Sequence, residues 1–248
     1  MAMTTEQSKA RRVALVFGGS RGIGAGIVER LARDGFDVAL TYVSRPDAAQ
    51  AAVAAVESAG GRGLAIRADS AKDAEIRAAV DQAVERLGPL DAVVVNAGVL
   101  RHGTVDAVST EDLDLSLRVN VRGVFLAIQA AVARMHDGGR VITIGSNTAI
   151  RTGTAGSSVY AMTKAAVAAM VQNLALDLAP RAITVNNVQP GPIETDMTAP
   201  FAEYLQDKLR LGRMGRSGEI GALVYFLAGP ESGYMTGASL TIDGGYVL

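Results

Sequence analysis

The sequence contains no cysteine, only two histidines and only 4% aromatic residues. Without cysteine the chain has no disulfide, no thiolate nucleophile and no cysteine metal ligand, which fits a cytoplasmic location. His102 and His136 lie far apart in sequence, so a histidine-based metal site is not expected and no metal is predicted. The scarcity of aromatic side chains argues against platforms on which nucleic-acid bases stack.

An excess of one charge and long apolar runs are also missing. Lysine and arginine total 24 and aspartate and glutamate 25, which gives a net charge of −1. A broad basic field for nucleic acid is therefore absent. Residues 1–12 are polar and lack the apolar core of a signal peptide. No apolar run approaches the roughly 20 residues of a membrane span. We expect no nucleic-acid or membrane partner, and a flexible segment over residues 1–11.

Hydrophobic residues are abundant, at 49% of the 248 residues, which is enough for the core of one sizeable domain over residues 1–248. Short β-branched segments alternate with longer Ala-rich amphipathic segments. This alternation predicts βαβ units with right-handed crossovers and a parallel sheet. The strands are expected at residues 12–17, 37–42, 62–67, 91–95, 140–145, 182–188 and 238–242. Helices are expected at 22–34, 46–59, 72–86, 111–135, 198–209 and 217–227, and in a segment that carries Tyr160 and runs to residue 178. Residues 190–211 interrupt the regular alternation, which is typical of a functional lid, here over the substrate.

A glycine-rich turn follows the first expected strand and opens the first expected helix. Glycine permits a tight turn there and lets backbone N–H groups approach a pyrophosphate, while the helix N-terminus supplies partial positive charge. A plain structural turn would have a similar composition, but the strand before it and the helix after it favour a dinucleotide site. The residues of this turn expected at the cofactor are Gly18, Ser20, Arg21, Gly22, Ile23 and Gly24.

The end of the second expected strand bears on which dinucleotide is bound. NAD-binding folds usually place an acidic residue here to bond the ribose 2′-hydroxyl, whereas a nearby arginine suits a 2′-phosphate. This chain has Tyr42, Val43 and Ser44 at the strand end, with Arg45 just beyond them and Arg21 in the glycine-rich turn. Two cations without a carboxylate favour NADP(H), and NAD(H) remains the alternative.

Tyr160 and Lys164 lie four residues apart at the start of an Ala-rich segment of helical character. That spacing places both side chains on one helix face. A free tyrosine has a pKa near ~10, and a nearby fixed positive charge favours the phenolate and lowers that pKa. The pair is therefore predicted to be a general acid/base tuned toward neutral pH, although the same spacing also occurs by chance on helix surfaces.

Two further motifs complete the pattern. Asn96, Ala97 and Gly98 follow the fourth expected strand, and the run from Pro190 to Thr195 follows the sixth. Together these features resemble the short-chain dehydrogenase/reductase family over residues 12–248, most closely its 3-oxoacyl-carrier-protein-reductase-like and carbonyl-reductase members. The family's Gly-rich turn begins with threonine and its Asn-Asn-Ala-Gly motif with asparagine, where this chain has Phe17 and Val95.

The resemblance implies the fold and the remaining cofactor contacts. The fold class is α/β, a single Rossmann-type doubly wound domain with a seven-stranded parallel sheet in the order 3-2-1-4-5-6-7 and helices on both faces. Asp69 and Ser70 are similar to the segment that contacts adenine. The nicotinamide carboxamide would meet the Ile193 backbone and the Thr195 hydroxyl, within a segment that starts at Pro190 and Gly191. Tyr160 and Lys164 would also contact the cofactor.

The resemblance further implies a catalytic set of Asn, Ser, Tyr and Lys, here Asn120, Ser146, Tyr160 and Lys164. The family's serine lies about 13 residues before its tyrosine. That count reaches Asn147, whereas 14 residues reach Ser146 at the end of an expected strand. We predict Ser146, because a strand end directs its side chain toward the cofactor, with Asn147 as the alternative. The tyrosine would protonate the developing alkoxide, and the asparagine would hold a water that passes protons from the lysine to solvent.

The substrate is expected between the Tyr160 loop, the segment after Gly98 and the lid. This cleft is mainly apolar, which indicates a medium-sized ketone or secondary alcohol. His102 is expected at the cleft mouth and not in catalysis, and the lid aromatics also have the spacing of ordinary helix packing. The residues predicted to contact substrate are Ser146, Ile150, Gly153, Tyr160, Met197 and Phe201.

The predicted function is NADP(H)-dependent hydride transfer between the nicotinamide and a ketone or secondary alcohol. The alternatives are an NAD-dependent alcohol dehydrogenase of the same fold and a catalytically silent, dinucleotide-sensing binding protein. The resemblance implies a homotetramer, and the apolar C-terminus from Gly237 to Leu248 points the same way, since exposed termini are normally polar.

Overall fold

The computed structural model describes residues 11–151 and 154–248. The predicted flexible segment, residues 1–11, lies outside this description except for Arg11, and the predicted substrate contact Gly153 also lies outside it. Residue Arg11, where the description begins, is anchored by hydrogen bonds from its guanidinium to the carbonyls of Ala32 and Phe36.

The centre of the molecule is a seven-stranded parallel sheet in the order β3-β2-β1-β4-β5-β6-β7, which confirms the predicted topology. The chain runs outward from β1 to β3 and then returns to β4 at the other side of β1. Open α/β sheets bind ligands at such a switch point, beyond the carboxyl ends of the strands. The strands are β1 (Arg12–Phe17), β2 (Phe36–Tyr42), β3 (Gly63–Arg67), β4 (Leu90–Val95), β5 (Met135–Ile144), β6 (Thr184–Pro190) and β7 (Ser239–Ile242).

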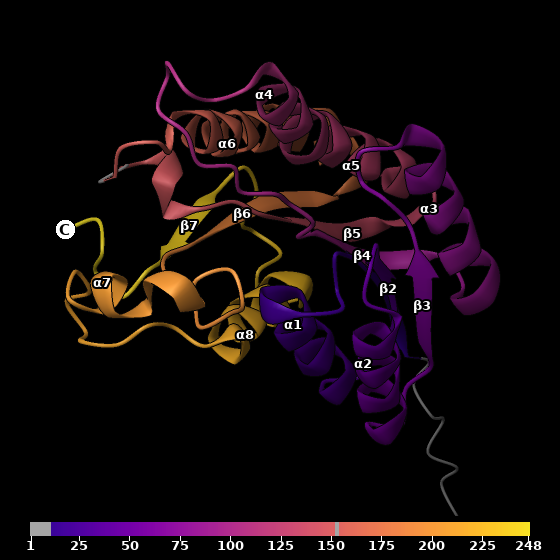
Figure 1. Cartoon of the computed structure of the whole chain (residues 1–248). Helices are drawn as coiled ribbons and strands as arrows, with labels where there is room; N and C mark the ends of the chain where they lie inside the picture. Colours follow the sequence, from indigo (N-terminus) through magenta and orange to yellow (C-terminus); the bar gives the residue numbers. More distant parts are fainter. Residues whose placement is uncertain (1–10, 152–153) are drawn as a thin grey trace, which may run out of the picture.

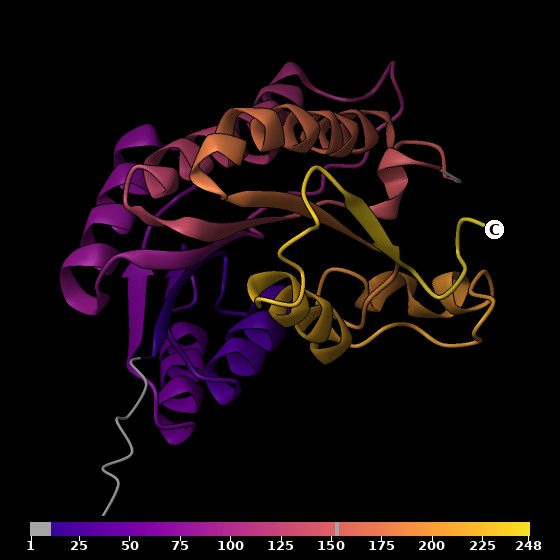
Figure 2. The same cartoon turned by 180° about the vertical axis from the view of Figure 1, so that it is seen from behind.

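Helices cover both faces of the sheet, as Figures 1 and 2 show. One layer contains α1 (Gly22–Arg33), α2 (Pro46–Ser58) and α8 (Ser217–Ala228). The other contains α3 (Asp73–Leu87), α4 (Thr110–Leu117), α5 (Val124–Val132) and α6 (Ser158–Leu178). A short helix, α7 (Ala202–Gln206), lies near the C-terminus in Figure 1, outside both layers.

Two cores result, one on each side of the sheet. Along β1, Leu15 points to the core formed with α3, α5 and α6, whereas Val16 points to the core formed with α1, α2 and α8. Both side chains are completely buried. Successive strand residues face opposite sides of the sheet, so a strand covered on both faces must be apolar throughout. This explains the continuous apolar runs in β1 and β4.

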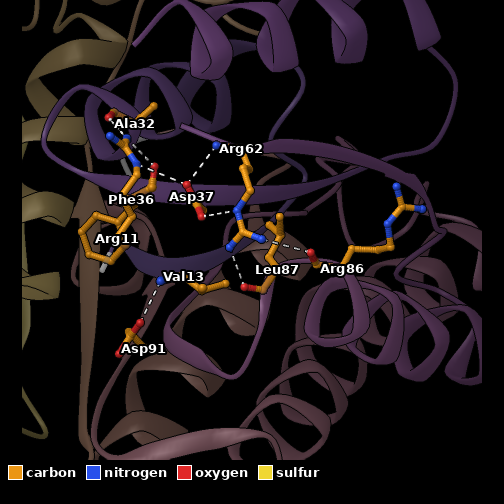
Figure 3. A network of polar contacts seen from close by, with 9 residues as sticks. All are labelled: Arg11, Val13, Ala32, Phe36, Asp37, Arg62, Arg86, Leu87 and Asp91. Carbon is orange, nitrogen blue, oxygen red and sulfur yellow. Dashed lines mark hydrogen bonds and ion pairs between the residues drawn. The ribbon is translucent and has the colours of Figure 1, made fainter. Parts of the chain in front are cut away.

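A buried carboxylate joins the amino ends of β2 and β3, at the end of the sheet away from the switch point. Asp37 accepts hydrogen bonds from the backbone N–H and the Nε of Arg62, at 2.9 and 2.6 Å, and pairs with Arg11 at 3.2 Å. Arg62 also donates to the carbonyl of Leu87 at the end of α3. In Figure 3 the two arginines approach Asp37 from opposite sides. The network fixes the relative positions of β2, β3 and α3.

The prediction of a long helix over residues 111–135 is confirmed for most of its length, because a continuous helical segment runs from Thr110 to Val132. The segment is not regular throughout. A π-helical turn, η1 (Arg118–Gly123), separates α4 from α5, and α5 ends at Val132 because Met135 already begins β5. The turn packs tightly on the loop after β3, since a Cβ built on Gly123 would lie 2.4 Å from the carbonyl oxygen of Ser70. A π turn inserts one residue into the helix and is frequent at functional sites.

The prediction of a helix over residues 198–209 is only partly confirmed. The segment contains a 3₁₀ turn, η4 (Ala199–Phe201), followed by the five residues of α7. Pro200 has no N–H to donate and fits only the first turn of a helix. The lid is therefore more irregular than its amphipathic pattern indicates.

Candidate functional site

The predicted site residues gather at the carboxyl ends of β1, β4, β5 and β6, around the switch point. Gly18 follows β1, Asn96 follows β4, Ser146 follows β5 and Gly191 follows β6. The backbone amides of Asn96 and Ala97 both donate to the carbonyl of Phe17, at 3.1 and 2.8 Å. These bonds lock the loop after β4 against the glycine-rich turn.

The glycine-rich turn is folded too tightly for side chains at its glycines. Gly18 has a φ of +73°, and a Cβ built on it would lie 2.9 Å from the Cα of Ala97. A Cβ on Gly24 would lie 2.0 Å from the carbonyl oxygen of Gly18, which also accepts a 2.7 Å hydrogen bond from the Asn96 side chain. The Asn96 side chain thus serves the turn itself. The turn leads directly into α1, with Ser20 and Ile23 partly exposed beside it.

The N-terminus of α1 is suited to an anion. Arg21 occupies the N-cap position in an extended conformation and makes no capping hydrogen bond within the described residues. The first turn, Gly22 to Gly24, carries no acidic side chain. Uncapped N–H groups at a helix N-terminus are the usual binding site for a phosphate, so the residues present fit the pyrophosphate of a dinucleotide.

The end of β2 is tied to the same turn. Gly18 donates to the Thr41 hydroxyl at 2.9 Å, and Gly19 donates to the Thr41 carbonyl at 3.0 Å. Tyr42 is partly buried and Ser44 is exposed. The Arg45 guanidinium pairs with Asp47 at 3.2 Å, and that pairing raises the pKa of Arg45.

The loop after β3 is built around Asp69. Its carboxylate accepts from the amide of Ala71 at 2.9 Å, and its own amide donates to Glu75 at 2.8 Å. Ser70, the next residue, lies under the π turn through the close approach to Gly123. The side chain of Asp69 is therefore engaged in shaping the loop, and the adenine contact of Asp69 and Ser70 stays a prediction.

The segment after β6 closes over the glycine-rich turn. The Gly191 amide donates to Ile242 at 3.0 Å, and Ile193 is buried. A Cβ built on Gly22 would lie 3.2 Å from Cγ2 of Thr195, so this segment reaches the start of α1. The Thr195 amide and hydroxyl contact the Thr198 hydroxyl at 3.1 and 3.2 Å, which fixes the start of the lid.

Ser146 and Asn147 contact each other, but each has a further partner. The Ser146 hydroxyl donates to the Asn147 side-chain oxygen at 3.5 Å and accepts from the Thr148 amide at 3.2 Å. Its interaction with the Tyr160 side chain lowers the pKa of that tyrosine. The Asn147 side chain donates instead to the carboxylate of Asp243 at 3.3 Å. The extra residue between strand and helix therefore directs the serine, and not the asparagine, toward the tyrosine.

Lys164 lies on the same face of α6 as Tyr160 but does not bond to its hydroxyl. The Lys164 Nζ donates a 2.8 Å hydrogen bond to the carbonyl of Ile144 and lies 5.6 Å from the centre of the Tyr160 ring. The lysine is 5% exposed. Burial lowers the pKa of Lys164 to about 8, because the charged form loses its water.

Asn120 lies in the π turn and reaches across to two elements. Its amide oxygen accepts from the Val99 amide at 2.8 Å, and its amide nitrogen donates to the Val99 carbonyl and to the Thr163 hydroxyl at 2.8 and 3.2 Å. Thr163 in turn donates to the Tyr160 carbonyl at 2.7 Å. The sequence reasoning missed Thr163, whose signal is only its position next to Lys164 on α6.

The predicted lowering of the tyrosine pKa is not found in the folded chain. Burial raises the pKa of Tyr160 to about 12, and the hydrogen bond with Ser146 opposes this to a smaller extent. Part of the side chain remains exposed. The reason is geometric, since the lysine nitrogen is turned to Ile144 and its charge is itself diminished by burial. Near neutral pH the tyrosine is therefore a neutral phenol, a proton donor.

Three apolar side chains predicted to contact substrate are exposed. Ile150, Met197 and Phe201 are 60%, 49% and 47% exposed. The Phe201 ring meets His102 edge to face, with ring centroids 6.0 Å apart. This contact joins the lid to the loop after β4. The substrate contacts of these side chains stay a prediction.

A family model described as enoyl-(acyl carrier protein) reductase matches residues 18–247. The chain belongs to the short-chain dehydrogenase/reductase family. The family member from Serratia marcescens is 50% identical with a TM-score of 0.93, over 96% of this chain and 98% of that one. A blue fluorescent protein from a metagenomic library, solved with NADPH, is 49% identical with a TM-score of 0.92 over the same shares. A curated relative in Escherichia coli K12, the cyclic-di-GMP-binding biofilm dispersal mediator protein, is 39% identical over 95% of this chain and 97% of its own length.

As a short-chain dehydrogenase/reductase, the chain is an NAD(P)-dependent oxidoreductase. Structural neighbours solved with NADPH or NADP favour NADP(H) as its cofactor. This agrees with the preference inferred from Arg21 and Arg45.

Proposed function

We propose that this short-chain dehydrogenase/reductase interconverts a ketone and a secondary alcohol with NADP(H), using Tyr160 as the general acid/base. The observation that carries the proposal is that Ser146, from the end of β5, and Lys164, from α6, both lie beside Tyr160, with the lysine nitrogen 5.6 Å from the centre of the tyrosine ring. When bound, the dinucleotide supplies or accepts the hydride. The protein contributes orientation and a proton at the substrate oxygen.

Each member of the set has a distinct role in the reduction direction. The Tyr160 hydroxyl donates its proton to the substrate oxygen, and its raised pKa keeps that proton in place at neutral pH. The Ser146 hydroxyl donates a hydrogen bond to the same oxygen, where negative charge builds up. Lys164, with a pKa near 8, exchanges protons readily around neutral pH. Asn120 holds the π turn against Val99 and Thr163, and Thr163 is the neighbour of Lys164 on α6.

The cleft favours an uncharged substrate of medium size. The side chains proposed to line it are mainly apolar: Ile150 and Met197 are exposed, and Phe201 on the lid packs against His102. Gly153 belongs to the proposed lining but lies outside the described residues. A ketone carrying an apolar substituent would bury that substituent here while its oxygen faces Tyr160.

The decisive experiment is the variant Tyr160→Phe, assayed with NADPH and a panel of ketones. We expect turnover to fall by at least about 100-fold, while NADPH affinity, measured by fluorescence titration, changes less than about threefold. Near-normal turnover in this variant would refute the assignment of the tyrosine. Loss of NADPH binding would indicate a structural role instead.

The same assay separates the alternatives. Comparing kcat/KM for NADPH and NADH distinguishes an NADP(H) enzyme from an NAD-dependent dehydrogenase of the same fold. Tight NADPH binding without turnover of any ketone would support a dinucleotide-sensing protein. Because the Escherichia coli relative is named as a cyclic-di-GMP-binding protein, cyclic-di-GMP belongs in the titration as a competitor of NADPH.

We further infer a homotetramer. Two helical segments, Thr110–Val132 and Ser158–Arg181, are long and apolar enough to span a membrane by composition, a test that core helices of soluble proteins also pass. Both segments pack on the sheet, yet Phe125, Met162 and Leu176 remain 42%, 47% and 74% exposed on them. Pairing between copies would cover these side chains.

A further inference from the structure

Two arginines are available to the adenosine end of the cofactor, and each already faces a carboxylate. Arg45 pairs with Asp47, its neighbour at the start of α2. Arg21, at the N-cap of α1, lies 4.0 Å from the carboxylate of Asp196. The charge of Asp196 also raises the pKa of Arg45, after the larger effect of Asp47. One lid carboxylate therefore acts on both arginines.

The position of Asp196 is fixed by its neighbours. Thr195 lies against Gly22 at the start of α1 and is held by Thr198. Asp196 therefore lies next to Arg21 because the preceding residue, Thr195, contacts the glycine-rich turn. Both side chains remain largely exposed, at 79% and 63%, so a ligand can displace the carboxylate.

A 2′-phosphate bound by Arg21 and Arg45 would meet this carboxylate. A phosphate monoester carries roughly 1.5 to 2 negative charges near pH 7, and NAD(H) has a neutral hydroxyl at the same place. Repulsion from Asp196 and its competition for Arg21 would weaken the binding of NADP(H) and leave that of NAD(H) nearly unchanged. Because the pair is solvated, the effect is limited to about three- to tenfold.

We propose that Asp196 is a cofactor-selecting residue, which reduces the margin by which this enzyme prefers NADP(H) to NAD(H). The inference rests on the proposed placement of the 2′-phosphate between Arg21 and Arg45. The carboxylate belongs to the same segment that starts the substrate lid, and binding of a 2′-phosphate would compete with its pairing to Arg21.

The test is the variant Asp196→Asn, with dissociation constants for NADPH and NADH measured by fluorescence titration. We expect NADPH to bind about three- to tenfold more tightly and NADH to change less than twofold. The gain should shrink at 0.5 M NaCl, since exposed charges are screened over a few ångströms there. Equal changes for both cofactors, or a gain that persists in high salt, would overturn the proposal.

Glu194→Gln is the matched control. It removes the same charge from the same segment, but the charge of Glu194 acts on Arg213 and raises its pKa, whereas Asp196 pairs with Arg21. Its ratio of NADPH to NADH affinity should equal that of the wild type, and an equal gain in this control would overturn the proposal. The titrations need no turnover, so failure of the proposed ketone chemistry would leave this result interpretable.

Discussion

The ammonium of Lys164 on α6 donates a 2.8 Å hydrogen bond to the carbonyl oxygen of Ile144, the last residue of β5. This bond joins the helix that carries Tyr160 to the strand that delivers Ser146. It also buries a cation, and that burial has consequences for stability that can be measured.

Lys164 makes stability depend on pH. Burial lowers the pKa of Lys164 to about 8 in the folded state, whereas the unfolded value is near ~10.4. Between these values the unfolded chain binds more protons, so the lysine's unfavourable contribution is full below pH 8 and is relieved as the pH rises. The difference in unfolding free energy, wild type minus Lys164→Met, should therefore increase by roughly 1 kcal/mol for each pH unit above pH 8. Urea unfolding at pH 7.5 and 9.5 measures this, and parallel pH curves would contradict it.

Ser146 and Asn147 should respond differently to truncation. Ser146→Ala removes the hydroxyl that bonds to Tyr160, so we expect kcat to fall by about 100- to 1000-fold with little change in NADPH affinity. Asn147→Ala removes the contact with Asp243 and should lower the melting temperature while costing less than about tenfold in kcat. Steady-state kinetics on both variants measures this. If Asn147→Ala were the inactive variant, the assignment of Ser146 as the catalytic residue would be wrong.

Asp37 should be important for stability and irrelevant to catalysis. Asp37→Ala leaves the Arg62 amide without its acceptor and separates two arginines from their shared carboxylate. Since both arginines can reach water, we expect a loss of about 2 kcal/mol, or roughly 4–8 °C in melting temperature for a chain of this size. The exposed pair of Arg45 and Asp47 provides the control, because Asp47→Asn should leave the melting temperature nearly unchanged. Equal melting temperatures for the two variants would contradict this account of the network.

A charge on the outer helix layer should dissociate the tetramer. Leu176 is 74% exposed on α6, and Leu176→Glu would place a carboxylate in the proposed interface. We expect light scattering to show a tetramer for the wild type and smaller species for this variant. Val105→Glu is the control, because Val105 is 88% exposed on a loop outside the helix layer. A monomeric wild type would exclude the assembly.

Most of the sheet could be predicted from the sequence, and so could the gathering of the candidate site residues at the carboxyl ends of its strands. The strands of a sheet covered on both faces are marked by continuous apolar runs, as in β1 and β4, because each side chain along them meets a core. The four-residue spacing of Tyr160 and Lys164 determines their shared helix face, since it follows from helix geometry alone. The glycines of the first turn are visible in the sequence, but the contact with Ala97 that leaves no room for a side chain at Gly18 comes from a distant segment.

Only the tertiary structure determined the features that depend on packing between segments distant in sequence. The π turn at Arg118–Gly123 lies against Ser70, a contact that no periodicity reveals. Asn147 donates to Asp243, which lies 96 residues further along the chain. The pKa of Tyr160 rises because burial outweighs the interaction with Ser146, while the lysine is turned to the end of β5. The sequence by itself determined which groups are present and which helix face they share, whereas desolvation and hydrogen-bond direction are set by the complete three-dimensional surroundings of each group.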